Sequence, residues 1–169
     1  MRIELLISKI ISRNLNANID NENIESLIEA FFEMGKVLSY YNDDIKFKVY
    51  VYQNRTLPVS LNVDFVVFLE QMLDFVCWIS KDNIQENFVL SFYEQGIELD
   101  IEFDKKKHEI HYRHYNKSDI IENFNILELK KDIKLFYQKL IFCITTLIPD
   151  LLKFDEIREW LQLMRNYLS

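Results

Sequence analysis

The sequence predicts an α+β domain with one antiparallel sheet, covered on one face by about five helices. Long segments at both ends of the chain repeat apolar residues at helical spacing, whereas residues 45–52 and 88–115 alternate apolar and polar residues as half-buried strands do. The chain has 169 residues, of which 49% are hydrophobic, enough for a sizeable core. No repeat and no Gly/Ser/Pro-rich linker divides it, so we expect a single domain over 1–169.

The N-terminal third predicts two helices and a strand. Residues 3–13 place isoleucine and leucine side chains on one helical stripe. The asparagine-rich stretch that follows predicts a loop, and Asp20 or Asn21 is expected to cap a second helix over 22–41. Residues 45–52 alternate strictly, and we expect this strand to join the main sheet.

The rest of the chain predicts a central helix, a meander and two final helices. Residues 62–80 are apolar almost all round, which indicates a largely buried helix. Three alternating segments over 88–115 predict three strands, joined by a turn at Gln95–Gly96 and a turn at "KKKH". Residues 127–148 and 155–168 have helical spacing, and Pro149 separates them.

The register of the meander follows from its pattern. A two-residue first turn and a four-residue second turn place the same apolar face toward the core, and a slip of one residue would turn that whole face to water. The expected cross-strand pairs are Phe92 with Leu99, Leu90 with Ile101, Phe88 with Phe103, Phe103 with Ile110, and Ile101 with Tyr112.

All three histidines of the chain lie in "HEIHYRHY", with the spacing H-x-x-H-x-x-H. On a strand, side chains three positions apart point to opposite faces, so we expect His111 on the open face, His114 on the core face and His108 in the turn. A shared metal ion would need further ligands from elsewhere, and we therefore predict no metal site. In place of a metal site, we expect a cross-strand pair of Glu102 with His111 and one partly buried histidine.

The face of the sheet turned away from the core, here called the open face, is rich in charge and tyrosine. It can be a solvated surface or a partner-binding surface, because tyrosine and arginine are favoured at contact hot spots. Asp100 is expected to pair with Arg113 across the strands. Its candidate partner-binding residues are Tyr93, Glu98, Asp100, Glu102, His111, Arg113 and Tyr115.

A second candidate surface is acidic. Glu22, Glu25, Glu29 and Glu33 line one side of helix 22–41, and only Lys36 offers a local counter-charge. These carboxylates are either a solvated face near the helix N-terminus or a patch for a basic partner.

Composition excludes several activities. Two glycines cannot form a phosphate-binding loop or a nucleophile elbow, and nothing implies a cofactor. The two cysteines, Cys77 and Cys143, lie in apolar runs, which favours buried free thiols over a disulfide. A net charge of −7 argues against direct nucleic-acid binding. No signal peptide or membrane-spanning run is evident, so we expect a cytoplasmic protein. Because no catalytic motif is present either, we expect it to have no catalytic activity.

The stretch "FVLSFYEQGIELDIEF", residues 88–103, resembles the hairpin of bacterial immunity proteins from polymorphic and contact-dependent growth inhibition toxin systems. The size, acidic charge and absence of catalytic motifs are similar too. The resemblance implies a cytoplasmic antidote that binds a cognate toxin domain, often a nuclease, and blocks its active site or substrate path. It implies no particular contact residues, because such proteins vary most at the toxin interface.

Two other functions remain open from sequence. The first is a non-catalytic bacterial regulatory or adaptor domain that binds another protein, or itself, through the open face. The second is a metal-dependent or hydrolytic enzyme that uses the histidine cluster. The sequence does not indicate the oligomeric state.

Overall fold

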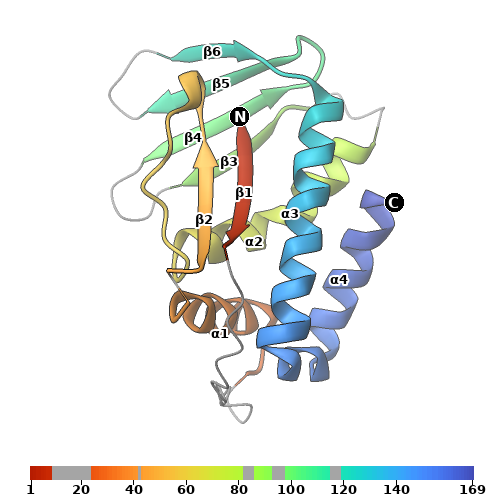
Figure 1. Ribbon diagram of the computed structural model, residues 1–169. Coiled ribbons are helices and arrows are strands. Elements are labelled where there is room, and N and C mark those ends of the chain that lie inside the picture. The colour runs from red at the N-terminus through yellow and green to blue at the C-terminus, as the bar shows by residue number, and fades with distance from the viewer. Residues whose placement is uncertain (9–23, 42, 82–85, 93–97, 115–118) are drawn as a thin grey trace.

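The computed structural model describes residues 1–8, 24–41, 43–81, 86–92, 98–114 and 119–169. Over these residues the fold is α+β, with four α-helices and two antiparallel sheets (Figure 1). In chain order the elements are β1 (Arg2–Ile7), α1 (Leu27–Ser39), β2 (Ile45–Tyr50), the 3-10 helix η2 (Tyr52–Asn54), α2 (Asp64–Ser80), β3 (Phe88–Phe92), β4 (Leu99–Asp104), β5 (Glu109–His114), β6 (Ile120–Asn123), α3 (Ile126–Leu147), the 3-10 helix η4 (Pro149–Lys153) and α4 (Asp155–Leu168).

The predicted meander is confirmed. The larger sheet has the order β3-β4-β5-β6, and its first two ladders have the register that the apolar pattern predicts. Phe92 lies opposite Leu99, and Ile101 lies opposite Tyr112. The core-facing residues Leu90, Leu99, Ile101, Phe103, Ile110 and Tyr112 are all buried. The first turn, at Gln95–Gly96, lies outside the described residues, whereas the second joins Asp104 to Glu109 as expected.

The prediction of a helix over 3–13 is wrong for its described part. Residues Arg2–Ile7 form strand β1, which pairs with β2 and buries Ile3 and Leu5. Ile3, Leu5 and Ile7 also fit a period of two, so this short apolar run was compatible with either element. Its pairing with β2 decided between them. The four α-helices are therefore one fewer than the sequence indicated.

Strand 45–52 does form, over Ile45–Tyr50, but it does not join the meander. It belongs to a separate two-stranded sheet with β1. The fourth strand of the larger sheet is instead β6, a short strand that pairs with β5. Its four residues, "IIEN", are too few for a periodic pattern, so the sequence did not reveal it.

Helix α2 connects the two sheets. Near its N-terminus Phe65 and Phe68 pack against Phe47 of β2, with ring centroids 5.4 and 5.6 Å apart. Near its C-terminus Phe75 packs against Phe103 of β4 at 5.0 Å. This explains why the sequence of α2 is apolar almost all round. The buried residues of all four α-helices and of β1 to β5 form one hydrophobic cluster.

The remaining helices lie around this core (Figure 1). Helix α3 runs along the length of the molecule beside β1, and α4 packs beside α3 and α2. Helix α1 starts at Leu27 rather than at 22, and its N-cap is Ser26 instead of Asp20 or Asn21. Within the described ranges, no helix is both long and apolar enough to cross a bilayer.

Candidate functional site

The open face of the four-stranded sheet carries five of the seven residues that the sequence placed on it as partner contacts. Alternation along β4 and β5 places Asp100, Glu102, His111 and Arg113 on this face, and Glu98 lies exposed just before β4. The other two, Tyr93 and Tyr115, fall outside the described residues, as does Glu22 of the acidic stripe.

The three histidines are separated as the alternation predicts. Nε2 of His111 lies 3.2 Å from Oε2 of Glu109. Nε2 of His114 lies 3.4 Å from the Tyr52 hydroxyl, on the core side. His108 is exposed in the turn, with a φ of 57°. In the part of the chain that the structure describes, no group of three or more histidine, cysteine or acidic side chains is arranged to hold a metal ion.

The ion pairs on the open face differ from those expected. Asp100 does lie opposite Arg113 in register, but the Arg113 guanidinium pairs with Glu102 and, at 3.6 Å, with Asp119. The expected partner of His111, Glu102, is therefore engaged elsewhere. The long arginine side chain reaches the diagonal neighbour, which register alone does not predict.

Neutral side chains complete this network. The Ser91 hydroxyl donates to Oδ1 of Asp100 at 2.6 Å, and Nδ2 of Asn87 donates to Oε1 of Glu102 at 2.6 Å. Two of the carboxylates on the open face are thus held in defined orientations by neighbouring strands. Side chains held in this way have little conformational freedom left to lose.

The open face has an acidic and partly apolar character. Among the described residues, its carboxylates are Glu98, Asp100, Glu102, Glu109 and Asp119, against one arginine. Val89 and Ile121 lie on the same face, 43% and 55% exposed. Sequence reasoning missed both: Val89 was visible from the alternation in β3, whereas Ile121 lies in the strand that was not predicted.

The acidic stripe on α1 is partly engaged in local structure. Ser26 and Glu29 cap the helix, because the Ser26 hydroxyl accepts from Glu29 N–H at 3.3 Å and Oε2 of Glu29 accepts from Glu25 N–H at 2.7 Å. Glu33 pairs with Lys36 at 3.1 Å, the counter-charge noted in the sequence. Helix capping thus accounts for Glu29, and an ion pair accounts for Glu33.

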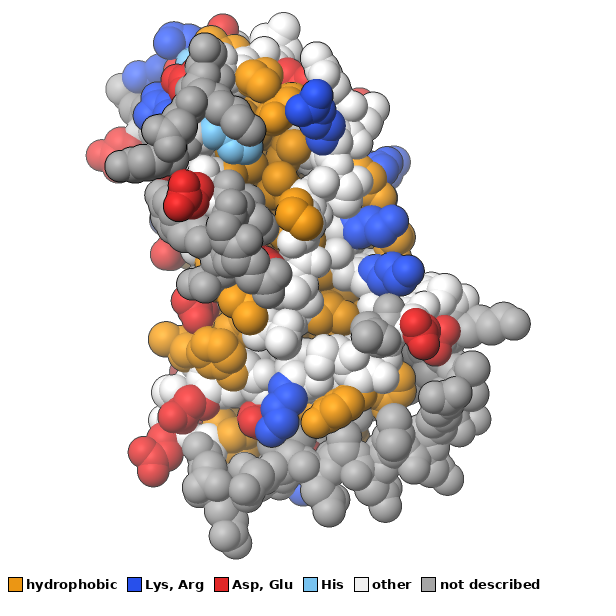
Figure 2. All heavy atoms as spheres, turned by 90° about the vertical axis from the view of Figure 1, so that its left-hand side faces the viewer, with side chains coloured by type: hydrophobic (Ala, Val, Ile, Leu, Met, Phe, Trp, Pro, Cys, Tyr) orange, Lys and Arg blue, Asp and Glu red, His pale blue; other side chains and the backbone are white. Residues whose placement is uncertain are grey.

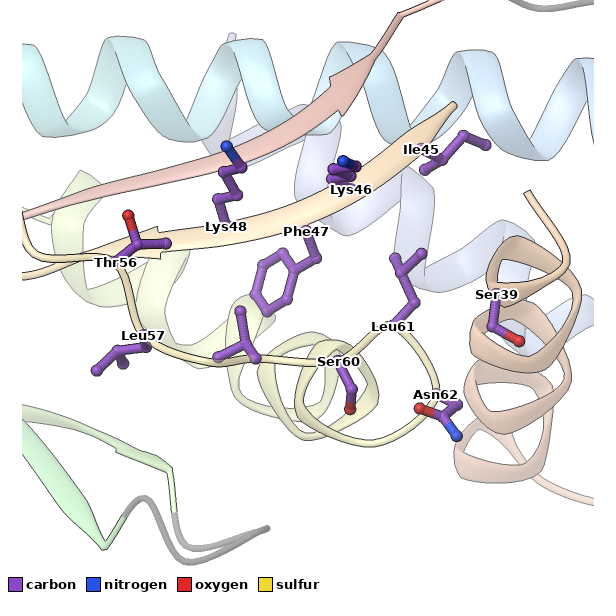
Figure 3. A pocket seen from close by; sticks show the side chains of 11 residues that line it. Ser39, Ile45, Lys46, Phe47, Lys48, Thr56, Leu57, Ser60, Leu61 and Asn62 are labelled. Atoms are coloured by element: carbon purple, nitrogen blue, oxygen red, sulfur yellow. The ribbon is translucent and has the colours of Figure 1, made fainter. Parts of the chain in front are cut away.

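A groove of about 430 Å³ lies between β2 and the loop that follows η2 (Figure 3). Phe47 and Leu61 approach each other across it, and Lys46 and Lys48 lie along β2 at its border. Figure 2 looks onto this side of the molecule, where hydrophobic side chains form a band with Lys and Arg side chains along one side of it. No sequence pattern singled out this groove.

Both cysteines are free thiols, as predicted. Cys143 is buried, and burial raises the pKa of its thiol to about 12, so it stays protonated and unreactive at neutral pH. Cys77 is partly exposed on α2, contrary to the expectation of full burial. The pKa of Lys81 is raised, mainly by a hydrogen bond to the Cys77 side chain.

Comparison with known proteins identifies no relative, since no family model, no curated protein and no solved structure matches the chain.

Proposed function

We propose that this chain is an immunity protein that binds and neutralises a cognate bacterial toxin domain, with the open face as its contact surface. The observation that carries the proposal is the acidic open face, whose described residues include five carboxylates, one arginine and two exposed apolar side chains. The resemblance of residues 88–103 to the hairpin of such proteins points the same way, because the described part of this stretch contains β3 and most of β4.

A nuclease domain fits this surface best among toxins. A nuclease needs a basic groove to hold phosphates, and an acidic surface is steered toward such a groove by long-range attraction. Val89 and Ile121 would supply the desolvated apolar contact that slows dissociation. Bound there, the protein would block the active site or the path of the substrate without any chemistry of its own.

The open face is a better contact surface than the stripe on α1. Capping and ion pairing already occupy Glu29 and Glu33, so these carboxylates support the helix itself. Glu98 and Asp119, in contrast, are exposed on the open face, and among the described residues only Asp119 of the two forms an ion pair, with Arg113. Charge there can therefore be changed with little effect on folding.

The test is co-expression with the toxin domain encoded by the neighbouring gene. A face variant with Glu98→Lys, Asp119→Lys and Ile121→Lys should lose protection against the toxin and bind it at least tenfold more weakly. The matched control is Glu156→Lys, Glu159→Lys and Leu163→Lys on α4, which makes similar changes at three exposed positions. It should protect as wild type does.

Two results would reject the proposal or its surface. A neighbouring gene product that is not toxic, or toxicity that the wild-type chain does not relieve, would reject the function. Full protection by the face variant would instead reject the open face as the contact surface. Measuring association rates at several salt concentrations separates steering from contact, since steering weakens as salt rises.

A further inference from the structure

Strand β2 has one edge that lacks a partner over part of its length. Ser8 N–H donates to Asp44 C=O at 2.8 Å, so the even-numbered residues of β2 share hydrogen bonds with β1. The N–H and C=O groups of Phe47 and Val49 therefore point to the opposite edge. Leu57 N–H donates to Val49 C=O at 2.9 Å, which confirms that the backbone groups of Val49 point away from β1.

The chain begins to cover this edge and then leaves it. Val51 N–H donates to Arg55 C=O at 2.8 Å, and continuation of this antiparallel pattern would place Val59 opposite Phe47. Instead, Val59 N–H donates to Leu57 C=O at 2.9 Å, in a tight turn around Pro58. Within the described chain, the N–H and C=O groups of Phe47 consequently have no hydrogen-bond partner.

The groove of Figure 3 occupies the place of the missing strand. It has a volume of about 430 Å³ and follows β2 from Ile45 to Lys48. Its apolar lining consists of Ile45, Phe47, Leu57, Val59 and Leu61. Unpaired strand edges are templates for another strand, and this edge has an apolar groove beside it.

Charge limits what can occupy the groove. Lys46 and Lys48 alternate with Phe47, so they lie on the solvent side of β2, and none of the described residues that line the groove is a carboxylate. Neither lysine forms an ion pair or a side-chain hydrogen bond with any residue that the structure describes. A second copy of this strand, paired antiparallel, would set lysine against lysine, which is unfavourable.

We propose that this edge binds an extended segment of a partner polypeptide, which adds to β2 as a further strand. Its outward side chains are acidic and lie beside Lys46 and Lys48, and the alternate side chains are apolar and enter the groove. The backbone groups of Phe47 supply the hydrogen bonds. This inference does not depend on the proposed toxin-binding function, because it concerns a different surface with the opposite charge.

The test uses two synthetic peptides, acetyl-Val-Glu-Val-Glu-Val-amide and acetyl-Val-Lys-Val-Lys-Val-amide, titrated into the full chain labelled with ¹⁵N. The glutamate peptide should shift the amide signal of Phe47 and slow its deuterium exchange at least tenfold. The lysine peptide should do neither. The double variant Lys46→Glu with Lys48→Glu should reverse this preference.

A matched control makes the same charge change elsewhere. Lys130→Glu with Lys131→Glu, at a separate hollow beside α4, should keep the wild-type preference. If the charge-reversed variant fails to fold, Lys46→Gln with Lys48→Gln should still bind the glutamate peptide at least fivefold more weakly than wild type does.

Four results would overturn the inference. The first is that the glutamate peptide has no effect on the Phe47 amide, and the second is that both peptides bind equally well. The third is that both lysine variants keep the wild-type preference. The fourth is that the Phe47 amide exchanges slowly even without peptide. In a monomer this last result would mean that the chain fills its own groove, and in a dimer detected by sedimentation it would mean that a second copy does.

Discussion

Asp104 shows how a single carboxylate shapes the turn between β4 and β5. Its Oδ1 accepts from the N–H groups of Lys106 and Lys107, each at 3.0 Å. Its Oδ2 lies 3.5 Å from Nζ of Lys107. The Lys107 N–H, more than any other group, lowers the pKa of this carboxyl. The turn that the sequence predicted from "KKKH" is thus closed by the residue that precedes it.

We expect Asp104→Ala to lower the free energy of unfolding by about 1–2 kcal/mol at pH 7, since two backbone N–H groups lose their acceptor. Because the pKa of Asp104 is lower in the folded state, its charge stabilises the fold at pH values above the pKa of the unfolded chain, about 3.9. This stabilisation is lost as the pH falls through the pKa of the folded state. Urea unfolding at pH 7 and pH 3.5 measures the difference.

The control for this prediction is Asp43→Ala, an exposed aspartate in a loop. The difference between Asp104→Ala and wild type should shrink as the solution becomes more acidic. A difference that stays the same at both pH values would show that the carboxylate charge is not what stabilises the turn.

At the scale of the elements, Gln71 of α2 covers the outer edge of β3. Its Oε1 accepts from Ser91 N–H at 2.9 Å, and its Nε2 donates to Ser91 C=O at 3.1 Å. The side-chain amide thus takes the place of a neighbouring strand at Ser91.

Gln71→Glu should be more destabilising than its small change in shape suggests. The carboxylate still accepts from Ser91 N–H but places a second acceptor against Ser91 C=O, so the partly buried carbonyl loses its donor. We expect a loss of about 1–3 kcal/mol, measured by urea unfolding. Gln138→Glu, an exposed glutamine on α3, is the matched control. Equal stability of the two variants would contradict the role of Gln71.

Gly35 determines how closely α1 approaches the loop before α2. A Cβ atom there would lie 2.6 Å from the Leu61 carbonyl oxygen and 2.9 Å from Cγ2 of Val66. Alanine in place of glycine favours a helix by about 1 kcal/mol, but overpacking costs about 1–3 kcal/mol, and a backbone oxygen cannot move aside cheaply.

We therefore expect Gly35→Ala to lower stability by about 1–2 kcal/mol in spite of its better helix propensity. The neighbouring exposed change Lys36→Ala, which removes the pair with Glu33, should cost about 0.5 kcal/mol or less. Thermal unfolding followed by circular dichroism compares them. An unchanged or higher melting temperature for Gly35→Ala would show that the contact relaxes.

At the scale of the whole molecule, two sheets share one core. Helix α2 packs against both, and the Tyr52 ring of η2 contacts Tyr112 of β5, with centroids 5.3 Å apart. Gln53 N–H also donates to Oε1 of Glu122 in β6 at 3.0 Å. These contacts connect the N-terminal sheet to the C-terminal end of the meander, far away in sequence.

We expect the chain to unfold as one cooperative unit. Trp78 lies against Phe103 near the four-stranded sheet, and Trp160 packs on Phe31 of α1 at 5.0 Å. In each of the variants Trp78→Phe and Trp160→Phe, the remaining tryptophan's fluorescence should report the same urea midpoint as far-UV circular dichroism. Two different midpoints within one variant would mean that the two ends unfold separately.

Local patterns predicted those parts of the fold whose partners are close in sequence. The register of β3, β4 and β5 follows from alternation and turn length, since a slip would expose Leu90, Ile101 and Tyr112. The same register placed the three histidines and most of the open face. The side-chain pairs were less predictable, because the long side chain of Arg113 reaches a diagonal partner.

The sequence by itself determined the α+β class, the register of the meander and the separation of the three histidines, because each depends on periodicity or on short turns. Only the tertiary structure decided that residues 2–7 form a strand, that β2 pairs with β1 and that β6 completes the larger sheet. Pairing between distant segments depends on competition among all available edges, which a local pattern does not record. The same competition leaves the backbone N–H and C=O groups of Phe47 without a hydrogen-bond partner among the described residues and opens the groove beside β2.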